Sequence, residues 1–72
     1  MSPEDKLAYM ANQIGRFFAT QKHDDAVAAI EDHLRKFWDP RMRTSILAHL
    51  DRVKLDPPVR AAVERLRPPA SS

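Results

Sequence analysis

The sequence predicts an all-α fold, a small bundle of three to four short helices followed by a flexible C-terminal tail. The chain of 72 residues contains one glycine and few runs of β-branched residues, a composition that disfavours a β-sheet. Its apolar residues recur at the spacing of one helix face. Ser-Pro or Asp-Pro pairs at residues 2–3, 39–40 and 56–57 are typical of helix starts.

These pairs predict where three of the helices begin. The Ser or Asp side-chain oxygen accepts a hydrogen bond from a free N–H of the first turn. Proline suits the first helical position because an N–H there would have no helical partner. We therefore predict five structural capping residues: Ser2, Asp39, Pro40, Asp56 and Pro57. The residue before a proline avoids helical backbone angles, so each pair also ends the segment before it.

The first helix is predicted over residues 3–20, with Glu4 and Asp5 favourably placed in its first turn. Its apolar residues at helical spacing are Leu7, Met10, Ala11, Ile14, Phe17 and Phe18. Gly15 costs this helix about 1 kcal/mol relative to alanine. Gly15 indicates either a close backbone approach or a tolerated surface glycine. Asn12 lies near the apolar stripe, and if buried it needs hydrogen-bond partners, from this chain or from another.

A second helix is predicted over residues 24–38, after the polar link "TQKHD" and with Asp24 or Asp25 near its start. Its apolar stripe consists of Val27, Ile30, Leu34 and either Phe37 or Trp38. This stripe predicts one face packed against the rest of the bundle.

The third helix is predicted over residues 40–53 and the fourth over residues 57–66. The third presents Met42, Ile46, Leu47, Leu50 and Val53, and the fourth presents Val59, Ala62, Val63 and Leu66. Residues 67–72, "RPPASS", offer nothing to bury and are expected to form a flexible tail. We expect a single helical domain over residues 1–72, with its core in about residues 3–66.

The composition argues against several classes of protein. No cysteine is present, which excludes disulfides and thiolate metal sites. We find no signal-peptide pattern and no apolar stretch of the ~18–20 residues that span a bilayer. The expected protein is soluble and cytoplasmic, without membrane contact.

The sequence shows no pattern of an independent enzyme. His23, His33 and His49 lack the H-E-x-x-H spacing of a metal site, and we interpret them as surface or boundary histidines. There is no G-x-S-x-G motif and no glycine loop that would hold a phosphate. We expect no catalytic, cofactor-binding or metal-binding residue in this chain.

Charge is distributed unevenly along the chain. The formal net charge is +2, but residues 1–34 hold three Lys/Arg against six Asp/Glu, whereas residues 35–72 hold nine against four. This asymmetry indicates a docking surface for an acidic partner, either protein or nucleic acid.

The densest cluster of cations is "RKFWDPRMR", residues 35–43. Arg41 and Arg43 lie in the predicted first turn of the third helix, where the helix dipole disfavours cations. Their position favours an acidic partner or an internal ion pair with Asp39 or Asp32. Tryptophan and arginine are also enriched among the residues that dominate binding energy at protein interfaces.

Two alternatives use the same residues. The first is a solvated basic corner that covers a buried tryptophan. The second is a nucleic-acid surface in which Arg41, Arg43, Thr44 and Ser45 open a recognition helix. A net charge of +2 is low for a phosphate-binding protein, and this disfavours the second alternative.

Three segments resemble a known family. "MANQIGRFF" (residues 10–18), "DHLRKFWDPRMR" (32–43) and "LDPPVRAAVERL" (55–66) are similar to the delta subunit of soluble, NAD-dependent, molybdenum-containing formate dehydrogenases. The most specific element is F-W-D-P-R-M-R. The chain departs from its relatives at "DRVKL" (51–55), where they often carry a loop with glycine.

The resemblance implies a non-catalytic accessory subunit of a complex that oxidises formate to CO2 and reduces NAD+. In such complexes the alpha subunit holds a bis-pterin molybdenum cofactor and iron–sulfur clusters. The beta and gamma diaphorase subunits hold FMN, further clusters and the NAD site. The delta chain is expected to hold no cofactor, to dock on the alpha subunit and to stabilise the complex. The alternative is a maturation factor that acts during insertion of the molybdenum cofactor.

We predict that a first set of residues, in the corner, contacts the partner: Arg35, Lys36, Phe37, Trp38, Arg41, Met42 and Arg43. A second contact set is predicted on the first helix: Asn12, Phe17 and Phe18. In the predicted mechanism, Trp38 and a phenylalanine fill pockets of the partner, and the arginines pair with its carboxylates.

Overall fold

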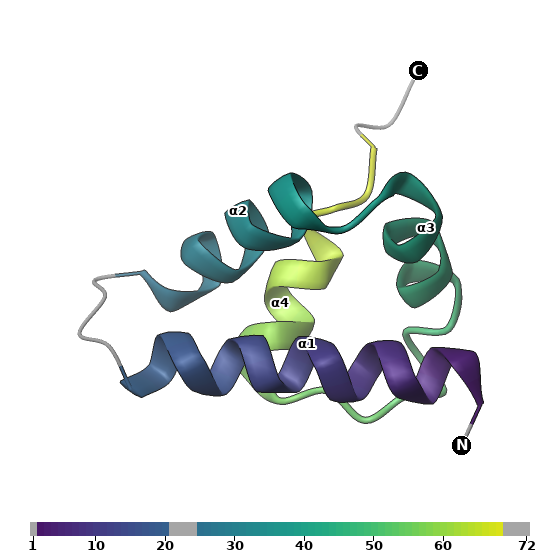
Figure 1. The fold of residues 1–72 in the computed structure, drawn as a ribbon, viewed down its shortest axis with the longest axis horizontal. Coiled ribbons are helices and arrows are strands. Elements are labelled where there is room, and N and C mark those ends of the chain that lie inside the picture. Colours follow the sequence, from purple (N-terminus) through teal and green to yellow (C-terminus); the bar gives the residue numbers. More distant parts are fainter. Residues whose placement is uncertain (1, 21–24, 69–72) are drawn as a thin grey trace.

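The computed structural model describes residues 2–20 and 25–68. Within these ranges it contains four helices: α1 (Pro3–Thr20), α2 (Ala26–Phe37), α3 (Pro40–Ala48) and α4 (Pro57–Glu64). No β-strand occurs in the described ranges, so the predicted all-α class is confirmed. The helix α4 packs against α1 and α2, while α3 packs against α1 and α4 (Figure 1).

Some predicted features lie outside the described residues. These are His23, Asp24 and the rest of the link over residues 21–24, together with residues 69–72 of the predicted tail. In the described part of the chain, none of the helices combines the length and the apolar character needed to cross a membrane.

The helices α1, α3 and α4 begin where the proline pairs predicted. Ser2 Oγ accepts a hydrogen bond from the Asp5 N–H at 3.3 Å. Asp39 Oδ1 accepts one from the Met42 N–H at 2.9 Å, which caps α3. Asp56 occupies the N-cap position of α4, but its side chain makes no capping hydrogen bond, so this part of the prediction is wrong. The reason is local: the first two residues of α4 are prolines, which removes one of the two N–H groups that a cap normally satisfies.

The helix α2 spans Ala26–Phe37, within the predicted range of 24–38. Its N-cap is Asp25, whose Oδ1 accepts a hydrogen bond from the Ala28 N–H at 3.0 Å. Trp38 follows as the C-cap with extended backbone angles, φ −87° and ψ 136°. The chain therefore turns away from the helix axis at Trp38.

The helix α3 ends at Ala48, before the predicted end at residue 53. Leu50 and Val53 are nevertheless buried, because the turn after α3 brings them into the core. The Leu50 carbonyl accepts a hydrogen bond from Arg60 Nη1 at 3.0 Å. A side chain of α4 thus replaces the backbone N–H that would bond this carbonyl in a longer helix. Apolar spacing predicted the buried residues correctly but not the backbone that carries them.

Gly15 marks a close contact between α1 and α4. It is buried, and a Cβ atom at this position would overlap Val59 Cγ2 on α4 and lie 3.7 Å from Ile30 Cδ1 on α2. Gly15 is therefore not a tolerated surface glycine: α4 approaches its backbone closely, through the side chain of Val59.

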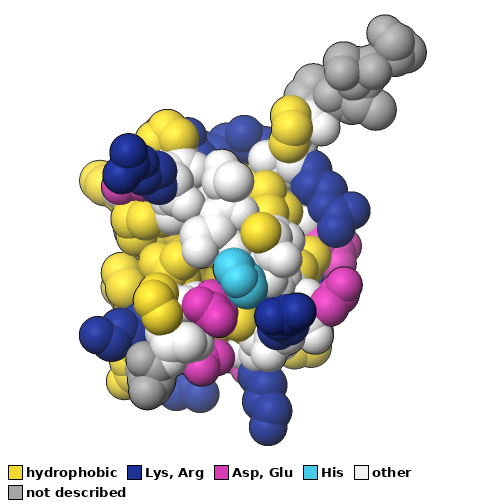
Figure 2. All heavy atoms as spheres, turned by 90° about the vertical axis from the view of Figure 1, so that its right-hand side faces the viewer, with side chains coloured by type: hydrophobic (Ala, Val, Ile, Leu, Met, Phe, Trp, Pro, Cys, Tyr) yellow, Lys and Arg dark blue, Asp and Glu magenta, His cyan; other side chains and the backbone are white. Residues whose placement is uncertain are grey.

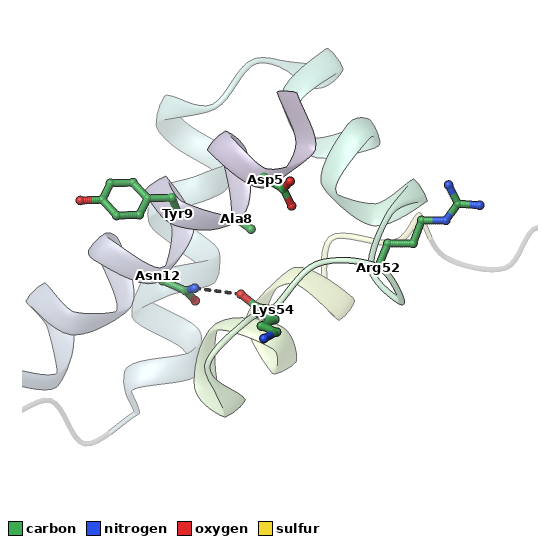
Figure 3. Close-up of a pocket in the computed structure, with 6 residues that line it drawn as sticks. All are labelled: Asp5, Ala8, Tyr9, Asn12, Arg52 and Lys54. Atoms are coloured by element: carbon green, nitrogen blue, oxygen red, sulfur yellow. Dashed lines mark hydrogen bonds between the residues drawn. The ribbon is translucent and has the colours of Figure 1, made fainter. Parts of the chain in front are cut away.

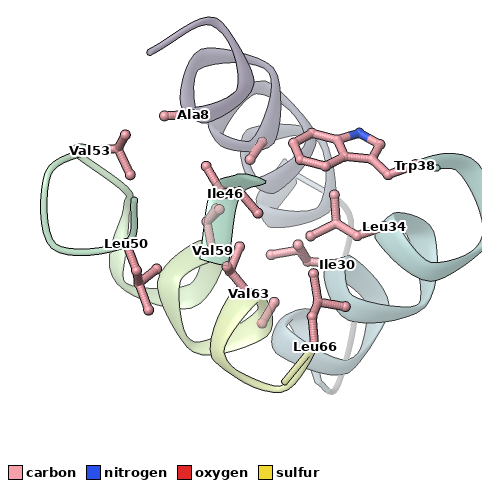
Figure 4. Packing of buried hydrophobic residues seen from close by; sticks show 12 residues of the cluster. Ala8, Ile30, Leu34, Trp38, Ile46, Leu50, Val53, Val59, Val63 and Leu66 are labelled. Atoms are coloured by element: carbon pink, nitrogen blue, oxygen red, sulfur yellow. The ribbon is translucent and has the colours of Figure 1, made fainter. Parts of the chain in front are cut away.

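One apolar cluster joins the four helices (Figure 4). Its buried members are Ala8, Ala11, Ile30, Leu34, Trp38, Ile46, Leu50, Val53, Val59, Ala62, Val63 and Leu66. The cluster contains no buried charged or polar side chain among the described residues. Leu66 lies beyond the end of α4 at Glu64, yet it remains in the cluster.

Candidate protein-docking surface

Trp38 belongs to the core. Only 5% of its surface is exposed, and Figure 4 shows its ring beside Leu34 and turned toward α1. The predicted role, in which Trp38 fills a pocket of the partner, is inconsistent with this position and is corrected. The structure instead matches the alternative of a basic corner over a buried tryptophan. Trp38 follows the buried Leu34 by four residues, the spacing of one helix face, and the extended backbone of the C-cap ends α2 at this position.

Arg43 holds the corner between α2 and α3. Its Nη1 donates hydrogen bonds to the carbonyls of Arg35 at 2.8 Å and Trp38 at 2.7 Å. These carbonyls lie at the C-terminal end of α2, where the helix dipole favours a cation. The position of Arg43 in the first turn of α3 is therefore explained within the chain, by carbonyls rather than by the Asp39 or Asp32 carboxylates.

Arg35 connects α2 to the end of α4. Its Nε lies 2.9 Å from Glu31 Oε2, and its Nη2 donates a hydrogen bond to the Arg65 carbonyl at 2.7 Å. Glu31 also forms an ion pair with Arg65, in which Oε1 and Nη1 are 3.6 Å apart. This network ties two helices together, so Arg35 has an internal role. Its side chain remains about half exposed, at 49%, and its contact with a partner stays a prediction.

The other residues of the corner differ in whether their side chains have partners within the chain. Lys36 Nζ lies 3.0 Å from Asp32 Oδ2 in an exposed ion pair. Met42 is half-buried and packs against the apolar cluster. Arg41 is exposed and, within the described residues, has no hydrogen-bond or ion-pair partner. It borders an open hollow of about 360 Å³ on the outer side of α3, which Pro40, Thr44 and Ser45 also line.

Asn12 is engaged within the chain. Its Nδ2 donates a hydrogen bond to the Lys54 carbonyl at 2.9 Å, and its Oδ1 accepts one from the Asp56 N–H at 2.9 Å. The partners that the sequence analysis required for this side chain thus come from the segment before α4. Asn12 fixes this segment against α1, and its contact with a partner stays a prediction.

A second open hollow, of about 300 Å³, lies beside this hydrogen bond (Figure 3). It is lined by Asp5, Ala8, Tyr9, Asn12, Arg52 and Lys54. The Tyr9 and Arg52 side chains point away from each other in Figure 3, so the polar groups do not converge on one point.

Phe17, Phe18 and Phe37 form one surface with His33. The ring centroids are 5.3 Å apart for Phe17 and Phe18, 5.9 Å for Phe18 and His33, and 4.7 Å for His33 and Phe37. We call these four residues the aromatic strip. Phe17 is 56% exposed and Phe37 is 72% exposed. Met10, exposed on α1, precedes Phe17 by seven residues and therefore lies on the same edge of that helix.

The aromatic strip unites residues that the sequence analysis placed in two separate contact sets. His33 provides the connection, and the sequence analysis had interpreted it only as a surface or boundary residue. The sequence did contain a signal that His33 contacts Phe37, because it precedes Phe37 by four residues and residues at this spacing meet on a helix surface. The contact across to Phe18 on α1 depends on how the two helices pack.

Cations do not form one continuous surface at the α3 end of the molecule. Figure 2 shows the Lys and Arg side chains of this face separated from one another, with hydrophobic, uncharged, acidic and His surface between them. Within the described ranges, no three His, Cys, Asp or Glu side chains are grouped as metal ligands would be. His49 Nδ1 lies 2.9 Å from the Ser45 carbonyl of its own helix.

The comparisons with known proteins identify the family. A family model described as "NADH-dependant formate dehydrogenase delta subunit FdsD" matches residues 6–63, a range that includes the aromatic strip and the basic corner. The curated proteins and the solved structures gave no match. The match confirms the resemblance inferred from the three sequence segments. The chain therefore belongs to the FdsD family of NADH-dependent formate dehydrogenase delta subunits.

Proposed function

We propose that this chain is a non-catalytic accessory subunit that docks on the molybdenum-containing alpha subunit and stabilises the formate dehydrogenase complex. The family match over residues 6–63 carries this proposal. A delta subunit is by definition part of an assembly. In this proposal the cofactors that oxidise formate and reduce NAD+ belong to the other subunits.

The distribution of side chains supports a binding role. Most of the large apolar residues pack into the core, yet Phe17 and Phe37 are left mainly in water. Arg41 has no internal partner among the described residues and is available to pair with a carboxylate of the alpha subunit. In contrast, the Arg43 and Asn12 side chains form hydrogen bonds within the chain that hold the shape of this surface.

Co-purification tests the proposal. The formate dehydrogenase subunits are expressed with and without this chain, the complex is captured through a tag on the alpha subunit, and its mass is measured by native mass spectrometry. We expect the chain to remain in the active complex at a fixed stoichiometry, and the complex without it to lose activity faster on dilution or warming. A fully active complex that lacks the chain, but forms only when the chain is co-expressed, would instead indicate a maturation factor.

A further inference from the structure

We propose that the aromatic strip is the docking surface of this chain, and that its occupant is an aliphatic surface of a larger formate dehydrogenase subunit with a carboxylate placed to meet Lys6. The inference rests on the proposed function, since it assumes a protein partner in that complex. It goes further by specifying which face is covered and the chemistry that covers it.

The first argument is exposure. Phe37 is 72% exposed although its neighbour Trp38 is 5% exposed, so the fold buries one aromatic of this pair and leaves the other in water. Phe17 is 56% exposed on the adjacent helix. Two large aromatic side chains joined by ring contacts form a contiguous apolar patch, and such patches mark interaction sites more often than scattered apolar residues do.

The second argument is that the side chains of the strip are held in a fixed arrangement. The rings of the strip contact one another in sequence, with centroids 4.7–5.9 Å apart, and they span α1 and α2. Ring pairs at these distances are favourable in themselves. Because the rings hold one another in place, little side-chain freedom remains to be lost when a partner covers them.

The third argument is charge. Lys6 lies one helical turn before Met10, on the same edge of α1, and within the described residues it has no side-chain partner. On α2, Lys36 is already paired with Asp32 at 3.0 Å. Arg16, which directly precedes Phe17, is also exposed and without a partner among the described residues. The unpaired charges on α1 along this edge and next to the strip are thus cations, and their complement on the partner is a carboxylate.

The same charges discriminate between classes of partner. Binding to anionic lipid or to a phosphate backbone relies on several cations lying together beside the contact surface. Single-stranded nucleic acid stacks on aromatic rings but also needs a positively charged groove along its backbone. On α1 the cations without a partner among the described residues are Arg16, next to Phe17, and Lys6, ten residues further from it, so they do not lie together. On α2, Lys36 is neutralised by Asp32. An apolar protein surface fits this pattern best.

The test compares variants that remove the same kind of side chain from different positions. Phe17→Ala and Tyr9→Ala each remove an aromatic side chain from α1, and both residues are 56% exposed. Only Phe17 belongs to the strip. Each full-length variant is titrated onto purified formate dehydrogenase that lacks this chain, with Phe37→Ala and Lys6→Glu as further strip and charge variants. Far-UV circular dichroism verifies that each variant keeps its helicity.

We expect Phe17→Ala and Phe37→Ala to raise the Kd by about 10- to 100-fold, the range for truncation of a dominant interface aromatic. Lys6→Glu should raise it by less and only at low salt. Tyr9→Ala should leave the Kd within about twofold of the wild type.

The proposed function and this inference fail in different ways. If the wild-type chain does not bind the complex, the proposed function is overturned. If the wild type binds and all the strip variants bind equally well, the strip is not the docking surface. If the chain alone forms a dimer in sedimentation experiments and Phe37→Ala abolishes that dimer, the occupant is a second copy and the inference is likewise overturned.

Discussion

Gly15→Ala tests the packing between α1 and α4. Alanine is better than glycine in a helix by about 1 kcal/mol, so propensity alone predicts stabilisation. However, the new Cβ would overlap Val59 Cγ2, and Val59 is fully buried. A valine on a helix has essentially one allowed χ1 rotamer, so its methyl group cannot rotate away and the helices must separate.

The two effects have estimable sizes. Extra methyl groups in a packed core typically cost about 1–3 kcal/mol. Set against the gain of about 1 kcal/mol in helix propensity, the expected result is a net loss of about 1 kcal/mol. In a domain of 60–100 residues this loss lowers the Tm by about 4–8 °C.

The assay is urea unfolding followed by far-UV circular dichroism, applied to a double-mutant cycle with Val59→Ala. Val59→Ala removes the methyl group that the new Cβ would meet. In that background Gly15→Ala should therefore stabilise the protein by about 1 kcal/mol, the propensity gain alone. The sign of the effect reverses between the two backgrounds. Stabilisation in the wild-type background, or the same loss in both, would refute the reasoning.

Two further predictions concern Trp38 and the helix caps. Trp38→Ala should cost about 3–5 kcal/mol, as for other buried tryptophans, which is comparable with the ~3–5 kcal/mol that the core of a chain of this size supplies. The far-UV circular dichroism signal should therefore fall, whereas a fully helical variant that no longer binds its complex would restore Trp38 to the contact surface. Asp39→Ala should cost about 1 kcal/mol in urea unfolding because it removes the cap on the Met42 N–H. Asp56→Ala should cost much less, since its side chain makes no such bond, and equal losses for the two would contradict this account.

Local sequence signals predicted the starts of α1, α3 and α4 and the end of α1, but they placed the end of α3 at residue 53 where the structure has Ala48. Asp39-Pro40 acts within one turn, so the start of α3 needs no information from the rest of the chain. Its end does depend on the rest of the chain. The Leu50 carbonyl is bonded by Arg60, ten residues away on another helix, and the turn after α3 is stabilised by that contact.

The residues of the candidate site were predicted only in part, because some of their contacts come from distant parts of the chain. Phe17, Phe37 and Arg41 were selected from sequence, and the structure leaves all three exposed. Asn12 was also selected, but its partners are 42 and 44 residues away in the chain, and no local pattern reports them. His33 was missed as a member of the strip because half of its contacts come from α1.

The sequence by itself determined the all-α class, where the helices begin and the family, because caps, apolar spacing and a rare motif are all local properties. Only the tertiary structure decided between Phe37 and Trp38. These neighbours have similar chemistry, and which one enters the core depends on the extended backbone at the end of α2 and on where α1 lies. The tertiary structure also turned Arg43 and Asn12 inward, since the carbonyls and the N–H that they bond are brought to them by other parts of the chain. Phe17 and Phe37 of the aromatic strip remain exposed after those contacts are made, as do Tyr9 and Met10.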